Sequence, residues 1–116
     1  MRHAKKTFKL DRKIGPRKAL IKTFADQLIL FEKVVTTEAR AKKIRPYIEK
    51  LITKSKNPTL ANVRILTARL KTKNAVNKLV TEIGKKYQNK NGGYTRIIKL
   101  GIRKGDAGST VRLELV

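Results

Sequence analysis

The sequence predicts an α+β domain in which a small three-stranded mixed sheet packs in two layers against about four helices, preceded by a basic N-terminal extension. Apolar residues recur at helical spacing in several segments, and two segments near the C-terminus alternate as strands do. Hydrophobic residues make up 40% of the 116 residues, which is enough for one modest core. A helical bundle with an appended C-terminal hairpin is the alternative, but two layers bury both apolar stripes more economically.

Residues 1–15 form the predicted extension, and residues 16–116 form the single domain. The extension has basic residues at irregular spacing and few sizeable apolar ones, chiefly Phe8, Leu10 and Ile14. It shows no sustained period of a helix or strand. We therefore expect it to be poorly ordered alone and to gain order where phosphates neutralise it.

The first half of the domain alternates helix, strand and helix. Pro16 suits a first helical position, and an apolar face then runs to Phe31. Adjacent valines predict a strand over residues 33–36, after which Thr36 or Thr37 caps a second helix. Pro46 conflicts with a regular helix, so we expect a kink or a late start there. The apolar positions of the two helices are Leu20, Phe24, Leu28 and Phe31, then Ile44, Ile48, Leu51 and Ile52.

The second half continues with two helices and two strands. Asn57-Pro58 marks a helix boundary with a cap and a first-turn proline, and the helix covers residues 60–70. Asn74 is predicted to cap the next helix, and Gly84 suits its end, although Tyr87 could extend it. After the break at residues 91–93, strands are expected over 95–100 and 110–115. In the last strand, alternation of Val111, Leu113 and Leu115 with charged residues predicts one buried face.

The net charge limits the possible classes of function more than any sequence motif does. Thirty Lys and Arg oppose eight Asp and Glu, giving a formal net charge of +22. Dense positive charge commonly serves to bind a phosphate backbone. An anionic membrane is disfavoured as the partner, because aromatic residues are only 5% of the chain and no apolar run approaches the roughly 20 residues of a membrane span.

Residues that carry catalysis or bind metals are scarce. The chain has no Cys and one His, so we expect no metal site, no cofactor and no small-molecule substrate. None of the eight acids is within three positions of another, so the sequence offers no carboxylate cluster for a hydrolase. Together these absences predict that the protein is not an enzyme. The N-terminus lacks the apolar stretch of a signal peptide, which predicts a cytoplasmic protein.

The turn from Gly92 to Arg96 is the most specific candidate for a binding site. Its glycines permit close approach of the backbone to another surface, Tyr94 offers a ring and Arg96 a forked donor. We expect Arg96 to contact RNA and Tyr94 either to stack on a base or to buttress the turn. In the alternative, the segment is an ordinary turn into a strand and Arg96 pairs with an acid such as Glu114 across the sheet. The basic residues of the helices also have an alternative interpretation, in which they form a solvent-exposed helix face that binds no partner.

Several segments together resemble one family. They are Met1-Arg2-His3, Val35-Thr36-Thr37, Arg40-Ala41-Lys42, Ala61-Asn62-Val63-Arg64, Gly92 to Lys99, Gly101, Arg103, Gly105-Asp106 and Glu114-Leu115-Val116. In this order, over essentially the whole length, the chain resembles bacterial ribosomal protein seventeen of the large subunit. The resemblance implies an α+β fold and binding to large-subunit ribosomal RNA near the rim of the polypeptide exit tunnel, beside neighbouring ribosomal proteins.

The predicted function is therefore a structural constituent of the ribosome that holds RNA. The rivals are an architectural DNA-binding protein, which would more often dimerise or present a recognition helix, and an RNA-processing enzyme. The residues predicted to bind RNA are Arg2, His3, Lys5, Lys6, Lys9, Arg12, Lys13, Arg17, Lys18, Arg40, Lys43, Arg64, Arg69, Tyr94, Thr95, Arg96 and Arg103.

Overall fold

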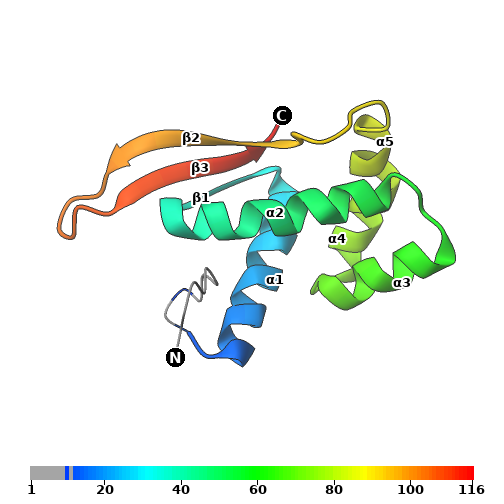
Figure 1. The fold of residues 1–116 in the computed structure, drawn as a ribbon, viewed down its shortest axis with the longest axis horizontal. Coiled ribbons are helices and arrows are strands. Elements are labelled where there is room, and N and C mark those ends of the chain that lie inside the picture. Colours follow the sequence, from blue (N-terminus) through cyan, green and yellow to red (C-terminus); the bar gives the residue numbers. More distant parts are fainter. Residues whose placement is uncertain (1–9, 11) are drawn as a thin grey trace, which may run out of the picture.

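Helices and strands follow one another in the predicted order (Figure 1). The computed structural model describes Leu10 and residues 12–116. Its elements are α1 (Ile14–Phe31), β1 (Lys33–Thr37), α2 (Glu38–Ser55), α3 (Leu60–Arg69), α4 (Lys73–Lys78), the π-helical turn η1 (Leu79–Ile83), α5 (Gly84–Lys86), β2 (Thr95–Ile102) and β3 (Ser109–Leu115).

The sheet confirms the α+β class but is antiparallel throughout, so the expectation of a mixed sheet is wrong. Its strand order is β1-β3-β2, and β3 pairs antiparallel with both neighbours. The left-handed conformation of Glu32 (φ 63°) ends α1 and turns the chain directly into β1. Because β1 pairs with β3, the last two strands belong to a three-stranded sheet and are not an appended hairpin.

Helix α2 is the centre of the structure (Figure 1). It runs beneath the sheet, and α1 and α3 pack against it. Its predicted apolar stripe is confirmed, because Ile44, Ile48, Leu51 and Ile52 are all buried. The helix starts at Glu38 and continues through Pro46, so the expected late start is wrong.

The inner face of the sheet completes this core with Val111, Leu113 and Leu115, as the alternation predicted. On α1 the buried apolar residues are Ala25, Leu28 and Ile29, whereas Phe31 is 69% exposed at the end of the helix. The face predicted for α1 is therefore only partly correct.

Three predictions about helix ends need correction. Thr59, and not Asn57, caps α3 by accepting a hydrogen bond from the N–H of Asn62. Thr72 caps α4 in place of Asn74, which lies inside that helix. Gly84 does not end its helix, since α5 continues to Lys86; a Cβ at Gly84 would come within 2.6 Å of the carbonyl oxygen of Ser55. Gly84 is there because α2 and α5 approach closely.

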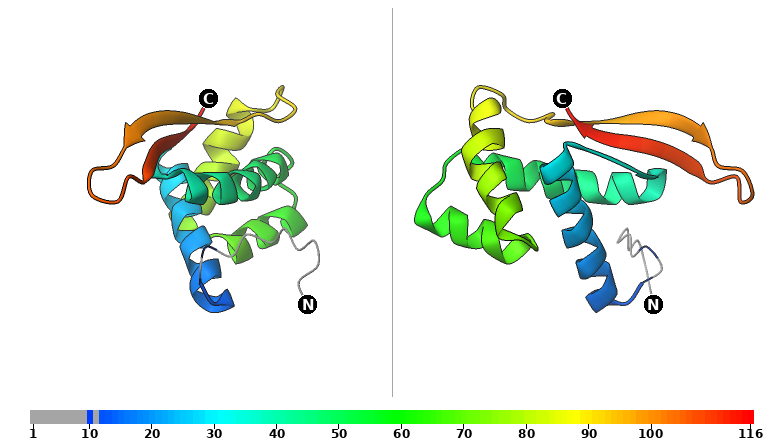
Figure 2. Two further views of the ribbon diagram at one scale, coloured as in Figure 1. Left: turned by 60° about the vertical axis from the view of Figure 1, so that its left-hand side comes forward. Right: turned by 180° about the vertical axis from the view of Figure 1, so that it is seen from behind.

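The two long strands extend well past the helices. Both views in Figure 2 show the β2–β3 hairpin projecting beyond the helical body. Its far end is exposed, and Ile102 at the end of β2 is 75% accessible. The protein thus has two separate surfaces that could meet a large partner, the helical body and the hairpin.

Candidate nucleic-acid interface

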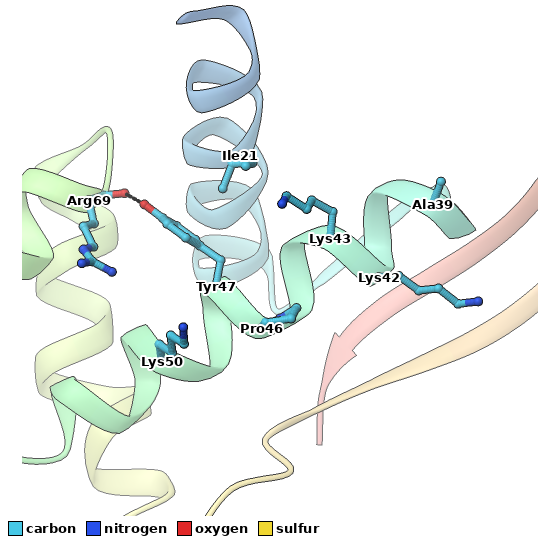
Figure 3. Close-up of a pocket in the computed structure, with 8 residues that line it drawn as sticks. All are labelled: Ile21, Ala39, Lys42, Lys43, Pro46, Tyr47, Lys50 and Arg69. Atoms are coloured by element: carbon cyan, nitrogen blue, oxygen red, sulfur yellow. Dashed lines mark hydrogen bonds between the residues drawn. The ribbon is translucent and has the colours of Figure 1, made fainter. Parts of the chain in front are cut away.

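A basic groove opens along one side of α2, between α1 and α3 (Figure 3). Its volume is about 510 Å³. Four of its lining side chains are basic and none is acidic. We call it the α2 groove, and its lining residues are Ile21, Ala39, Lys42, Lys43, Pro46, Tyr47, Lys50 and Arg69.

Two neighbouring hollows extend this surface, and both share Arg69 with the α2 groove. The first has a volume of about 390 Å³ and adds Lys18 and Lys22 from α1. The second has a volume of about 540 Å³, adds Lys54 and contains the carboxylate of Glu49. The three hollows therefore present seven basic side chains and one acid, which makes this side of the helical body strongly electropositive.

Helical spacing and one hydrogen bond assemble the groove. Lys43, Tyr47 and Lys50 lie on one face of α2, because they are separated by four and three residues. The Tyr47 hydroxyl donates to the carbonyl oxygen of Arg69 at 2.6 Å, which holds the end of α3 against α2. Burial raises the pKa of Tyr47, and the nearby Arg69 acts in the opposite direction. The hydroxyl therefore stays protonated and keeps donating at neutral pH.

The basic side chains of the groove differ in whether an acid already neutralises them. Lys42 pairs with Glu38 at 3.0 Å, and this hydrogen bond lowers the pKa of Glu38. Lys43, Lys50 and Arg69 form no ion pair with any carboxylate in the described part of the chain. Their charge remains available to an external anion.

The turn before β2 is held by α2, and its residues Tyr94 and Thr95 are buried. Glu49 accepts hydrogen bonds from the N–H groups of Tyr94 (3.2 Å) and Thr95 (3.0 Å) and from the Thr95 hydroxyl (2.7 Å). Gly92 and Gly93 have positive φ values of 110° and 63°, a conformation that glycine adopts at little cost. Tyr94 and Thr95 are 1% and 2% exposed.

This burial leaves little of Tyr94 and Thr95 exposed for the RNA contact that was predicted for them. The Tyr94 ring packs against Tyr87, with ring centroids 5.2 Å apart, and its hydroxyl donates to the carbonyl oxygen of Lys90. It cannot stack on a base unless the turn opens. Of the two roles predicted for Tyr94, this structure supports the buttressing of the turn.

The arginines of the hairpin form ion pairs with carboxylates of the same chain. Arg96 lies opposite Glu114 in the sheet and contacts it at 2.6 Å, while Arg112 reaches the same carboxylate at 3.0 Å. At the hairpin end, Arg103 donates two hydrogen bonds to Asp106. These bonds, together with the N–H of Gly108, lower the pKa of Asp106 to about 2. The hydrogen bond that Arg96 donates to Glu114 likewise lowers the pKa of Glu114.

The remaining predicted residues are distributed unevenly. Lys18, Lys43 and Arg69 line the hollows around α2. Arg12, Lys13 and Arg17 lie at the start of α1, Arg64 is exposed on α3, and Arg40 lies over the Phe24 ring at 6.0 Å. Arg2, His3, Lys5, Lys6 and Lys9 lie outside the described residues.

Four basic residues of this surface were missed by the sequence analysis: Lys22, Lys42, Lys50 and Lys54. A signal for two of them existed. Lys22 follows Lys18 by one helical turn, and Lys50 follows Lys43 by two turns, so each extends a basic face that was already recognised.

Neither a clustered metal site nor a membrane span is found in the part of the chain that the structure describes. Among Leu10 and residues 12–116, no three His, Asp or Glu side chains gather as metal ligands do. Within the same residues, no helix has both the length and the apolar character needed to cross a bilayer.

Comparison with known proteins gives consistent matches over the whole chain. Residues 20–116 match the family model described as ribosomal protein L17. The large ribosomal subunit protein bL17 of Wolinella succinogenes is 46% identical over 116 residues, which cover 100% of both chains. The protein of the same name from Campylobacter concisus is 45% identical over all of this chain and 98% of its own, and that of Erythrobacter litoralis is 44% identical over all of this chain and 83% of its own.

Proposed function

The chain belongs to the ribosomal protein L17 family and has a structural, non-enzymatic role in the large ribosomal subunit, and we propose that it acts there by binding and stabilising large-subunit ribosomal RNA. The basic surface around α2 is the observation that carries this proposal. It gathers seven cations from three helices, and Lys43, Lys50 and Arg69 have no internal carboxylate partner among the described residues. Such a surface suits a folded polyanion, because it contacts phosphates from several directions at once.

The proposed contacts form two groups. The first is the surface around α2, where the structure adds Lys22, Lys42, Lys50 and Lys54 to the predicted Lys18, Lys43 and Arg69. The second is the basic N-terminal extension of residues 1–15, which we propose follows RNA beyond the single domain of residues 16–116, together with Arg17 at the start of that domain. Arg40 and Arg64 are further contacts, whereas Arg96 and Arg103 are weaker ones because each already binds a carboxylate.

We also propose a position near the rim of the polypeptide exit tunnel, beside other large-subunit proteins. This proposal rests on the family resemblance of the sequence. The protein is located in the ribosome, in the cytoplasm, because the relatives that it matches are named as large-subunit proteins. Crosslinking of the protein in intact subunits, followed by mass spectrometry, tests this position: partners away from the tunnel rim would contradict it.

Sedimentation of a cell lysate on a sucrose gradient tests the role in the subunit. The tagged full-length protein is expected in the large-subunit fractions, and high salt should release it as phosphate contacts weaken. Binding to purified large-subunit RNA is the second measurement. If about ten basic groups contact phosphate, log affinity should fall against log salt with a slope of roughly −7 to −9. A slope near zero, or cosedimentation with the nucleoid, would contradict RNA binding.

A further inference from the structure

The α2 groove combines an apolar floor with cationic walls. Ile21, Pro46 and Tyr47 contribute apolar surface, and the lysines of α2 and Arg69 of α3 surround them (Figure 3). A surface that only neutralises a regular duplex needs no apolar floor, because duplex bases are stacked inside the helix. An unpaired nucleotide has the matching chemistry, with a planar apolar base joined to an anionic phosphate.

Pro46 gives this floor a second property. Proline has no backbone N–H, so the carbonyl of Lys42 loses the hydrogen bond that residue 46 would donate to it in α2. Both residues line the groove. A proline inside an 18-residue helix is costly, yet here it supplies a ring for the floor of the groove.

We propose that the α2 groove receives one unpaired nucleotide of large-subunit ribosomal RNA. The base lies against Ile21, Pro46 and Tyr47, and the flanking phosphates bind Lys43, Lys50 and Arg69. The groove volume of about 510 Å³ falls within the range of roughly 300–1,000 Å³ that is usual for small-ligand sites. This inference rests on the proposed RNA-binding function and specifies which form of RNA the groove accepts.

The variant Pro46→Ala tests the proposal without changing any charge. It restores an N–H to α2 and removes the ring from the floor, so the protein should become more stable and yet bind RNA less well. Pro58→Ala is the matched control, because Pro58 is an exposed proline that does not line the groove. If Pro46 had only a structural role, its replacement by Ala would not raise the stability of the protein while lowering its affinity for RNA.

The probes are a short single-stranded RNA oligonucleotide and a blunt duplex of the same strand length, each titrated with full-length protein. For Pro46→Ala we expect the melting temperature to rise by about 5 °C or more. Affinity for the single strand should fall about fivefold or more, with less than about twofold change for the duplex and an unchanged salt slope. Pro58→Ala should retain the wild-type affinity for both.

Two results would overturn the nucleotide site: unchanged single-strand affinity of Pro46→Ala, or equal weakening toward both RNAs. Neither touches the proposed function, which fails separately if the wild-type protein itself shows no salt-dependent binding to large-subunit RNA. A third variant, Ile21→Trp, fills the floor from α1, with Leu60→Trp on the exposed start of α3 as its control. Wild-type single-strand affinity of a folded Ile21→Trp protein would also count against the site.

Discussion

The helical body and the β2–β3 hairpin both carry many basic residues, but they use them differently. In the body, Lys43, Lys50 and Arg69 surround a groove and have no carboxylate partner among the described residues. In the hairpin, Arg96 and Arg112 share Glu114, and Arg103 binds Asp106. Positive charge on one surface is thus available to a partner, while much of that on the other already stabilises the strands.

This difference shows why counting basic residues does not locate a binding site. An arginine that already donates to a carboxylate has part of its charge neutralised and fewer N–H groups left for phosphate. A lysine that faces solvent without an acid loses only counterions when phosphate arrives. The comparison therefore assigns most salt-dependent affinity to the unpaired cations of the body, together with the basic residues of the N-terminal segment.

Removing the N-terminal segment should have the largest effect on binding. Deletion of Met1 to Lys13 takes away six Lys or Arg residues, so the salt slope should shrink by roughly 4–5 and RNA affinity should drop sharply. The fold should survive because α1 begins at Ile14. Filter binding and circular dichroism measure the two outcomes. Loss of helical signal would show that the segment is part of the domain.

Replacing Glu49, which joins the two regions, should affect stability instead. Glu49→Gln puts an amide where a carboxylate accepts three hydrogen bonds from Tyr94 and Thr95, so the free energy of unfolding should fall by about 1–3 kcal/mol. RNA affinity should not decrease in the folded protein, because the change removes an acid from a basic surface. Urea unfolding and filter binding on the same protein test both statements.

A substitution of Arg96 tests whether the charge of this residue stabilises the sheet or binds RNA. Arg96→Ala should lower the melting temperature by about 5 °C at most, because the ion pair with Glu114 is partly exposed. RNA affinity should change less than about threefold if the hairpin arginines serve mainly the sheet. A larger loss of affinity without a change in melting temperature would restore Arg96 as a primary RNA contact.

The smallest effect concerns the hairpin end. The pKa of Asp106 is about 2, well below its ordinary value of 3.8, because Arg103 and the N–H of Gly108 bond to the carboxylate. A depressed pKa means that this pair stabilises the hairpin above about pH 3.8 and that the contribution is lost as the pH falls through about 2. Carboxyl titration by NMR should show Asp106 shifting toward 3.8 in Arg103→Ala.

Local patterns in the sequence were sufficient for most of the fold. The buried stripe of α2 and the alternation of β3 were both predictable because each depends on the period of one element. Helix caps were less predictable, since Thr59 and Thr72 compete with nearby asparagines for the same role. Gly84 was misassigned because its close approach to Ser55 depends on how α5 packs on α2.

The candidate site was harder to predict than the fold. Lys43 and Arg69 were selected as basic residues, but nothing local indicates that α2 and α3 place them around one groove. The Tyr47 hydrogen bond that joins these helices spans 22 residues. Conversely, the Gly92 to Arg96 turn had the composition of a binding loop, yet Glu49, 45 residues from Tyr94, draws it into the core.

The salt dependence of RNA binding in two matched triple variants tests the central claim most directly. One variant combines Lys43→Gln, Lys50→Gln and Arg69→Gln in the groove, and the other combines Arg96→Gln, Arg103→Gln and Arg112→Gln in the hairpin. Both remove three positive charges. We predict that the slope of log affinity against log salt shrinks by roughly 2–3 in the groove variant and by less than about 1 in the hairpin variant. Equal changes, or a larger change in the hairpin variant, would contradict the account.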